Sequence, residues 1–313
     1  MELRENKLEL LVSLPPSSQI DRRYVRSGEI TRQVRKEVEG RDWRNKSYVE
    51  ICDFVEDAIR RRGGEPAFPT NVCVNESTAH YTAEIEDPKT VVEDALLKVD
   101  LGAHIDGFIT DTSVPLCYDE DLLDMTESTK SALSEAIKAI RVGVRAGDIG
   151  KIVEAYASRR GYRPIANLAG HSLEQYVIHA GLSIPNVSSS HTPSFKEDKV
   201  YAVEPFFTTG DGSGIVVEGK SKNIFGLVAR KNTKDQRLND LLDLIWRRRR
   251  TLPFAARWFA KEYRKEELQA MLRELERMKL IRSYPELIEG KKKPVAQAEH
   301  TVATTSAGIL VLT

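Results

Sequence analysis

The 313-residue sequence has only three cysteines, no long hydrophobic run and no net charge. Cys52, Cys73 and Cys117 lie far apart, which excludes a disulfide framework and a cysteine-ligated zinc site and favours a reducing compartment. No apolar stretch approaches the ~18 residues that a membrane-spanning helix needs. The 47 basic and 47 acidic side chains cancel, so no overall field attracts nucleic acid or anionic lipid.

The first residues carry mixed charge, and the apolar stretch 8–14 is too short and poorly flanked for a signal peptide. We therefore expect a cytoplasmic protein that does not bind a membrane. Hydrophobic residues make up 41% of the chain and include three Trp, nine Phe and ten Tyr, which is enough for a packed core and excludes a disordered chain. The length suggests two domains or one large α/β unit.

Two passages of the sequence end in similar helix stops. A capping box at Ser47 begins an apolar helical stripe that ends at Gly63, where glycine accepts the left-handed conformation. Further along, Asp148 can cap a second helix, which ends at Gly161. A proline follows each stop at the same distance. The pattern indicates a weak internal duplication, with two α/β halves that each place helices ahead of strands.

Residues 231–289 differ in character from the rest, because they are rich in Leu and Arg and contain helical runs such as Leu268, Met271, Leu272 and Leu275. An extended, Thr- and Val-rich stretch follows Pro294. We expect residues 1–230 and 290–313 to form the main domain and residues 231–289 to form a helical insertion subdomain.

The run Arg247–Arg250 lies in this insertion, beside Trp246. Arginine binds phosphate without sequence preference, so one hypothesis is that this patch contacts ribosomal RNA. A solvated helix face is the commoner outcome for a run of like charges and is the alternative that we favour.

The most informative segment runs from Leu97 to Val114. Asp106-Gly107 is a strong hairpin signal, because both central residues of a type I′ turn need positive φ. This turn would pair Gly102 with Asp111, and side-chain alternation would then place Asp100 and Asp111 on one face while the other face is apolar.

Asp100 and Asp111 would be diagonal neighbours with Cβ atoms roughly 7 Å apart. Two carboxylates that close repel each other unless a cation lies between them or one takes up a proton. A solvated face with two ordinary acids is the alternative, but this face is thinned by Gly102 rather than decorated with several lysines. The segment therefore favours metal binding. His104 shares the face but lies about 13 Å along the strand from Asp100, so we expect it at the hairpin tip.

Hard divalent cations take oxygen and imidazole ligands, so further acids and histidines in strand-like or glycine-flanked settings are candidates. His171 follows a glycine, and His179 lies eight residues later. Glu204 and Glu299 are single acids within apolar, strand-like runs, where an uncompensated carboxylate is costly.

Together these segments resemble the methionine aminopeptidases of type 2, in their archaeal-like form. The similarity covers residues 20–313. The matching segments are Ala67–Asn71, Asn75–Glu76, Ala79–Thr82, Asp100–Gly107 with Asp111, Asn167–Ser172, Ile178–Gly181, Ala202–Phe206 and Gln297–Thr301.

The resemblance implies the pita-bread (creatinase/aminopeptidase) fold, an α/β (α+β) architecture with two pseudo-symmetric halves around a dinuclear metal site and a winged-helix-like helical insertion. It implies two divalent ions per chain, and cobalt, manganese, iron(II) and zinc all accept such ligands. Asp111 and Glu299 would bridge the ions. The implied metal ligands are Asp100, Asp111, His171, Glu204 and Glu299.

The resemblance also assigns catalytic and substrate-binding roles. Glu204 would act as general base, while His80 and His179 would bind the substrate and the developing oxyanion. Phe68, Ile178 and Phe206 match positions that line the methionine pocket. Gln297 shares the face of Glu299 and is expected to hold a carboxylate or water. His300 is expected to pack on the opposite side.

The implied activity is co-translational removal of the initiator methionine from the N-termini of nascent polypeptides when the second residue is small, by a monomer. One alternative is a catalytically silent pita-bread adaptor that binds nucleic acid or protein, but such a protein should have broken ligand positions. Another is a proline-directed pita-bread peptidase, which the insertion and the Ala79–Thr82 context disfavour. Ser77-Thr78 and Ala83 depart from the family pattern and leave the detail of the pocket open.

Overall fold

The computed structural model describes residues 18–313, so the apolar stretch 8–14 lies outside the described residues. No helix within this range is long and apolar enough to cross a membrane. The α-helices of the described chain are α1 (Arg22–Glu39), α2 (Tyr48–Arg61), α3 (Leu123–Ala139), α4 (Ala146–Arg159), α5 (Gln236–Arg249) and α6 (Lys265–Arg277).

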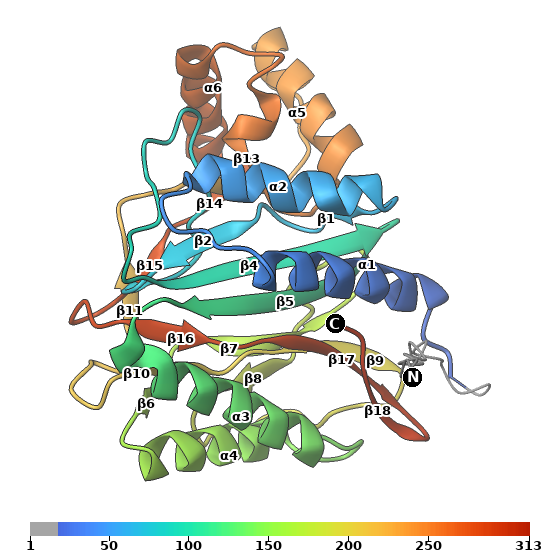
Figure 1. Cartoon of the computed structure of the whole chain (residues 1–313). Helices are drawn as coiled ribbons and strands as arrows, with labels where there is room; N and C mark the ends of the chain where they lie inside the picture. Colours follow the sequence, from blue (N-terminus) through green and yellow to red (C-terminus); the bar gives the residue numbers. More distant parts are fainter. Residues whose placement is uncertain (1–17) are drawn as a thin grey trace, which may run out of the picture.

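The first half of the chain forms a four-stranded sheet beneath α1 and α2 (Figure 1). Its strands are β1 (Glu65–Pro66), β2 (Asn71–Val74), β4 (Leu96–Ile105) and β5 (Phe108–Cys117). The order is β1-β4-β2, with β5 on β4. The predicted capping box at Ser47 and Glu50 is present at the start of α2. The apolar stripe of α2 packs into one buried cluster with strands β2 and β4.

The second half forms a five-stranded sheet of order β18-β17-β9-β7-β8, with α3 and α4 packed on its outer side (Figure 1). Its strands are β7 (Ala169–Leu173), β8 (Ser183–Pro185), β9 (Lys199–Val203), β17 (His300–Thr305) and β18 (Gly308–Val311). A smaller sheet beside it contains β6 (Arg163–Pro164), β10 (Phe206–Thr208) and β16 (Val295–Gln297).

Both halves repeat one local order, as the internal duplication predicts. Helix α2 leads through Gly63 to β1, and α4 leads through Gly161 to β6, with φ of 81° and 77° at the two glycines. The expected cap at Asp148 is wrong, because α4 begins at Ala146 and its N-cap is Arg145. Asp148 lies instead in the first turn of α4, where a carboxylate interacts favourably with the helix dipole.

The predicted hairpin is confirmed residue for residue. Gly102 pairs with Asp111, and the turn residues Asp106 and Gly107 have φ of 49° and 86°. A Cβ on Gly102 would lie 2.6 Å from Phe68, so glycine is needed for the close approach of that ring. His104 lies near the tip, as expected, and its Nδ1 accepts a hydrogen bond from the Gly107 amide at 3.0 Å.

The two halves are joined by hydrogen bonds between β5 and β17. The Thr301 hydroxyl accepts from the Asp111 amide and donates to the Asp111 carbonyl, both at 2.7 Å. The Thr112 hydroxyl donates to the Glu299 carbonyl at 2.7 Å. All these groups are buried, so the bonds fix the strand that carries Asp111 against the segment that carries Glu299.

Helices α5 and α6 form a separate unit above the first half, with a core of its own (Figure 1). Its sheet contains β12 (Ile224–Leu227), β13 (Phe254–Ala255) and β14 (Ile281–Tyr284). In contrast, β15 (Leu287–Glu289) pairs with β11 (Val216–Glu218) and β3 (Ser77–Ala79) of the main domain. We therefore propose that the subdomain spans about 224–284 rather than 231–289.

Two buried polar networks attach this insertion to the first half. Glu56 on α2 accepts hydrogen bonds from Arg257, from Trp258 Nε1 at 2.6 Å and from the Thr70 amide at 3.2 Å. The buried Arg249 guanidinium donates to the Pro66, Ala67 and Pro253 carbonyls. All of these Arg249 partners are backbone carbonyls rather than carboxylates.

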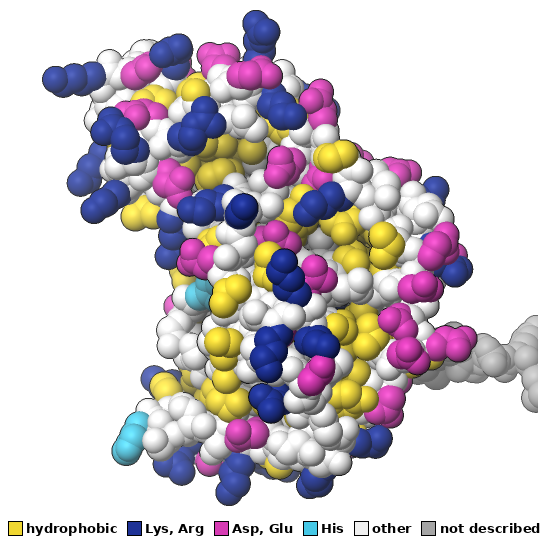
Figure 2. Space-filling model, turned by 90° about the vertical axis from the view of Figure 1, so that its left-hand side faces the viewer, with side chains coloured by type: hydrophobic (Ala, Val, Ile, Leu, Met, Phe, Trp, Pro, Cys, Tyr) yellow, Lys and Arg dark blue, Asp and Glu magenta, His cyan; other side chains and the backbone are white. Residues whose placement is uncertain are grey.

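The run Arg247–Arg250 is therefore neither a continuous basic patch nor the fully solvated helix face that we favoured, because Arg249 is buried. Arg249 is 5% exposed, and Arg248 pairs with Glu262. Only Arg247 and Arg250 of the four are left for an outside partner, and Arg250 lies over the Trp246 ring. Figure 2 shows basic and acidic side chains mixed over the face that it displays, in keeping with the zero net charge of the chain.

Replacing Thr301 with valine should destabilise the junction between the halves. The Thr301→Val variant leaves the Asp111 amide and carbonyl unpaired, and we expect the free energy of unfolding to fall by about 2–4 kcal/mol. Thr301→Ser keeps the hydroxyl and should lose only about 1 kcal/mol for one methyl group. Urea unfolding of the metal-free proteins measures both values. Equal losses in the two variants would contradict the role of these hydrogen bonds.

His104 should make the folded protein sensitive to mild acid. Burial, and then the charge of Arg249, lower the pKa of His104 to about 3. In the unfolded chain His104 takes up a proton near its ordinary pKa of about 6.5. The contribution of His104 to stability is therefore complete at neutral pH and is lost as the pH falls below 6.5. The His104→Asn variant cannot take up this proton. Relative to that variant, the free energy of unfolding of the wild type should fall by about 1–2 kcal/mol between pH 7 and pH 5. A difference that stays constant with pH would refute this assignment.

Candidate metal centre

The five predicted ligands come from both halves and meet where the two sheets adjoin. Asp100 and Asp111 lie on β4 and β5, and His171 lies on β7. Glu204 directly follows β9, and Glu299 directly precedes β17. Because Val203 pairs with His300, these two glutamates lie side by side just beyond the end of that pairing. The structure therefore brings together all five residues.

Three of the carboxylates form a compact group. Asp100, Asp111 and Glu299 each offer an oxygen atom, and these atoms lie within 4.8 Å of one another. His171 Nε2 lies 3.8 Å from Asp111 Oδ2 and 3.5 Å from Glu204 Oε1. The Gln297 amide donates to Glu299 Oε2 at 3.3 Å, in agreement with its expected role.

Burial and mutual repulsion strongly disfavour the charged forms of these acids. Burial raises the pKa of Asp100 to about 7. The pKa values of Asp111, Glu204 and Glu299 are raised well above the usual range, first by burial and then by the charges of the neighbouring carboxylates. A cation removes this penalty directly, because it pairs with several carboxylates at once.

The donor set fits divalent ions. Oxygen atoms Asp100 Oδ1 and Asp111 Oδ1 are buried and have no protein partner among the described residues. Burial, and then His179, lower the pKa of His171 to about 3, so its imidazole is neutral as a metal ligand must be. Four carboxylates and one imidazole form a hard, mixed O/N set that suits manganese, iron(II), cobalt or zinc.

The two other histidines that the sequence singled out flank this group. His179 lies against His171, with ring centroids 4.4 Å apart. Burial, and then the charge of His179, lower the pKa of His80 to about 4. Burial, and then the charge of Arg282, lower the pKa of His179. Both rings are therefore neutral at pH 7. His300 does not line this cavity, and its Nδ1 lies 3.1 Å from the Thr313 hydroxyl on the other side of the strand.

The acids and histidines open into one cavity of about 150 Å³. A cavity of this size has room for several water molecules or for one substrate side chain. Phe68, Ile178 and Phe206 line it as expected. Further lining residues to which sequence reasoning gave no role are Asn71, Ala79, Leu168, Ala169, Ile224, Pro253 and Tyr284.

Three of these additional residues, Ile224, Pro253 and Tyr284, come from the insertion unit. No local pattern marks them, because their place at the cavity depends on how the insertion packs on the main domain. Asn71 is different, since it belongs to the segment that carries the family resemblance and could have been singled out there.

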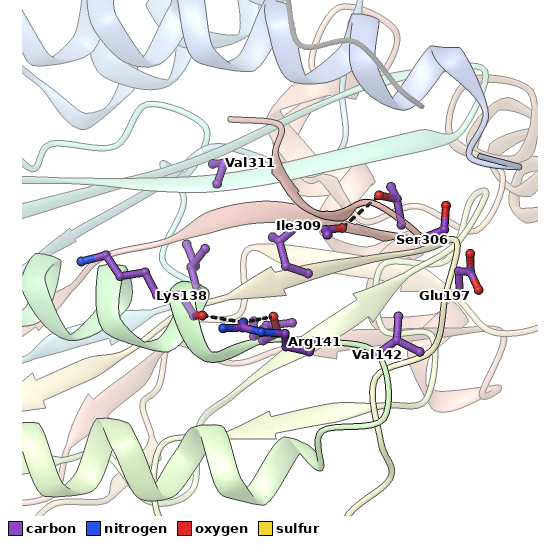
Figure 3. A pocket seen from close by; sticks show the side chains of 11 residues that line it. Lys138, Arg141, Val142, Glu197, Ser306, Ile309 and Val311 are labelled. Carbon is purple, nitrogen blue, oxygen red and sulfur yellow. Dashed lines mark hydrogen bonds between the residues drawn. The ribbon is translucent and has the colours of Figure 1, made fainter. Parts of the chain in front are cut away.

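A larger hollow of about 670 Å³ lies elsewhere, between the end of α3 and the β17–β18 hairpin (Figure 3). Lys138, Arg141, Glu197 and Ile309 are among the side chains that line it. Arg141 Nη1 donates to the Lys138 and Ile140 carbonyls, so its guanidinium is partly engaged by backbone. None of the predicted site residues lines this hollow, which separates it from the candidate metal centre.

The chain matches metallopeptidase family M24 over residues 22–226. It is 40% identical over 291 residues to the methionine aminopeptidase of Saccharolobus solfataricus, which covers 92% of this chain and 95% of that relative. The methionine aminopeptidase from Thermotoga maritima has a similar structure, with a TM-score of 0.64 and 19% identity over 96% of this chain and 97% of the other. A thermophilic Arx1 reaches a TM-score of 0.79 at 16% identity, covering 93% and 89%.

At such identities the two structural matches show the fold alone, which is the pita-bread fold that the sequence implied. The family match covers more than half of the chain, and the Saccharolobus relative aligns over nearly all of it. Both confirm the resemblance that the ligand motifs indicated. The chain belongs to metallopeptidase family M24.

Proposed function

We propose that this protein is a metal-dependent aminopeptidase that removes methionine from the N-termini of polypeptides. The observation that carries this proposal is the group of four carboxylates and one histidine at the end of a small apolar cavity. The relatives of nearly equal length that share 33–40% identity are methionine aminopeptidases. The apolar residues that line this cavity beside the carboxylates suit a single side chain at the first position of a substrate.

The proposed metal ligands are Asp100, Asp111, His171, Glu204 and Glu299. Four carboxylates carry the charge that two divalent cations balance, which supports two ions rather than one. Divalent ions held there would lower the pKa of the attacking water and polarise the scissile carbonyl. Asp111 and Glu299, which lie among the other carboxylates, would help to hold the ions from both halves of the chain.

The chain's own groups supply the remaining chemistry. Glu204 accepts a proton from the attacking water and delivers it to the leaving amine. Neutral His179 keeps an N–H that can donate to the substrate carbonyl and to the oxyanion that forms from it. His80 is proposed to contact the substrate with the ring that also bonds to the Pro285 backbone. A free α-amino group close to the carboxylates would restrict cleavage to the first peptide bond.

Specificity for methionine is assigned to the apolar wall of Phe68, Ile178 and Phe206. The Phe68 ring packs over Gly102 on the hairpin that carries both aspartates, so the pocket and the ligands share one rigid element. A flexible, unbranched side chain such as methionine fills an apolar gap of this size well.

The alternative functions receive no specific support. A silent adaptor would have lost ligands, whereas all five side chains are present and converge. A proline-directed peptidase would need another pocket than this narrow apolar one. Contact with the ribosome stays a hypothesis with weaker support, because Arg249 is buried and Arg248 is paired. A monomeric state also stays a prediction.

The proposed activity is tested by release of free amino acid from short peptides. The protein should be stripped of metal and then loaded in turn with manganese, cobalt, iron(II) or zinc. We expect methionine release from Met-Ala-Ser and negligible alanine release from Ala-Ala-Ser, because a methyl group leaves most of the pocket unfilled. Equal release from both peptides would refute the specificity, and preference for a peptide with proline in second place would indicate the proline-directed alternative.

Asp111→Asn should abolish metal loading at the centre. Loss of groups that merely orient metal ligands already costs 10–100-fold, so loss of a metal ligand itself should lower activity by more than about 100-fold. Metal content after dialysis against micromolar manganese should fall from two ions to at most one. Asp106→Asn on the same hairpin, with an exposed side chain, is the matched control and should keep both ions. Full loading of the Asp111 variant would overturn the ligand assignment.

A further inference from the structure

His80 has an unusual backbone conformation for a residue that is proposed to bind substrate. It directly follows β3 and has φ of 64°, in the left-handed region that non-glycine residues seldom adopt. Such a conformation is costly and persists only where the surrounding structure holds it. Some specific contact must therefore hold the His80 backbone in this conformation.

The contact made directly to the His80 amide comes from the side chain of Asn71. Its Oδ1 accepts a hydrogen bond from the His80 amide at 2.9 Å. Its Nδ2 donates to the Pro69 carbonyl at 2.7 Å. Asn71 is 2% exposed and lines the proposed substrate cavity. Both ends of the buried amide group are thus used, and both partners are backbone groups beside the cavity.

The position of Asn71 in the sheet links these contacts to the metal centre. Asn71 is the first residue of β2 and pairs with Asp100 on β4. Pro69 directly follows Phe68, which forms part of the apolar wall. One side chain therefore connects the strand of a proposed ligand, the loop that bears the pocket phenylalanine and the backbone of His80.

We propose that Asn71 is a positioning residue that fixes His80 for substrate binding and catalysis. The inference rests on the proposed function of His80 and extends it to a residue that no motif role explains. Asparagine suits the position because it offers one acceptor and one donor without charge. An aspartate would lose the donor to Pro69 and add a fifth carboxylate beside Asp100, and alanine would lose both bonds.

Loss of the bond to Asn71 would let His80 relax toward an ordinary backbone conformation and move its ring. Displacement of a catalytic group by about 1 Å can cost on the order of 100-fold in rate. The side chain of Asn71 bonds to Pro69 and His80 and to no metal ligand among the described residues, so metal binding should persist when this side chain is removed.

The test compares Asn71→Ala, His80→Ala and the double variant in the full-length, metal-loaded protein. We expect Asn71→Ala to lower kcat for Met-Ala-Ser by roughly 10–100-fold with two ions still bound. If Asn71 acts through His80, the double variant should be no slower than His80→Ala alone within about threefold. Multiplicative losses in the double variant, or a kcat of Asn71→Ala equal to that of the wild type, would overturn the proposal.

Asn239→Ala is the matched control, because the Asn239 amide also bonds to backbone through both ends, at Thr233, but lies in the insertion. It should keep the wild-type kcat.

Hydrogen exchange gives a second readout that does not depend on activity. The His80 amide should be protected in the wild type and exchange faster in Asn71→Ala, while the Val72 amide, which bonds to the Tyr81 carbonyl at 2.7 Å, stays protected. If the wild type releases no methionine, the proposed function fails, and this measurement still decides whether Asn71 holds His80. Unchanged protection of the His80 amide would reject the inference.

Discussion

The concentration of negative charge at the junction of the two halves governs the rest of this structure. Four carboxylates are held in one small volume, and two of their oxygen atoms are buried without a protein partner. Such an arrangement is unfavourable for the chain alone, because desolvation and repulsion act in the same direction. The fold must therefore hold the acids together by rigid means, and metal binding recovers the free energy that their assembly costs.

Strand pairing and buried hydrogen bonds hold these acidic residues in place. Asp100 and Asp111 are fixed by a ten-residue antiparallel pairing, and Glu299 is fixed by the threonine bonds that join β5 to β17. The internal duplication explains how residues from two distant parts of the chain can meet in one site. Each half contributes helices outside and strands inside, so the inner strands of both halves face one shared interior, and neither half contains a complete ligand set.

Much of this centre could be predicted from the sequence because its signals are local. The Asp106-Gly107 turn alone determines the register that places Asp100 and Asp111 on one face, and lone acids in apolar strands mark Glu204 and Glu299. Residues whose roles arise from tertiary packing could not be found in that way. Tyr284 and Pro253 reach the cavity only through the insertion, and the burial of Arg249 contradicts its place in a run of four arginines. The prediction of a cap at Asp148 was wrong because α4 starts three residues earlier, almost one turn before the position that this polar residue indicates.

The insertion unit has its own sheet and its own hydrophobic core, as a separable module would. Its attachment through Glu56 and Arg249 means that it cannot be excised cleanly. A shortened enzyme built by joining the main domain across the gap would deprive the buried Glu56 of its bonds from Arg257 and Trp258 and leave the Pro66 and Ala67 carbonyls without their donor. Protein engineers seeking a minimal catalyst would have to redesign α2 and the Pro66–Ala67 loop as well.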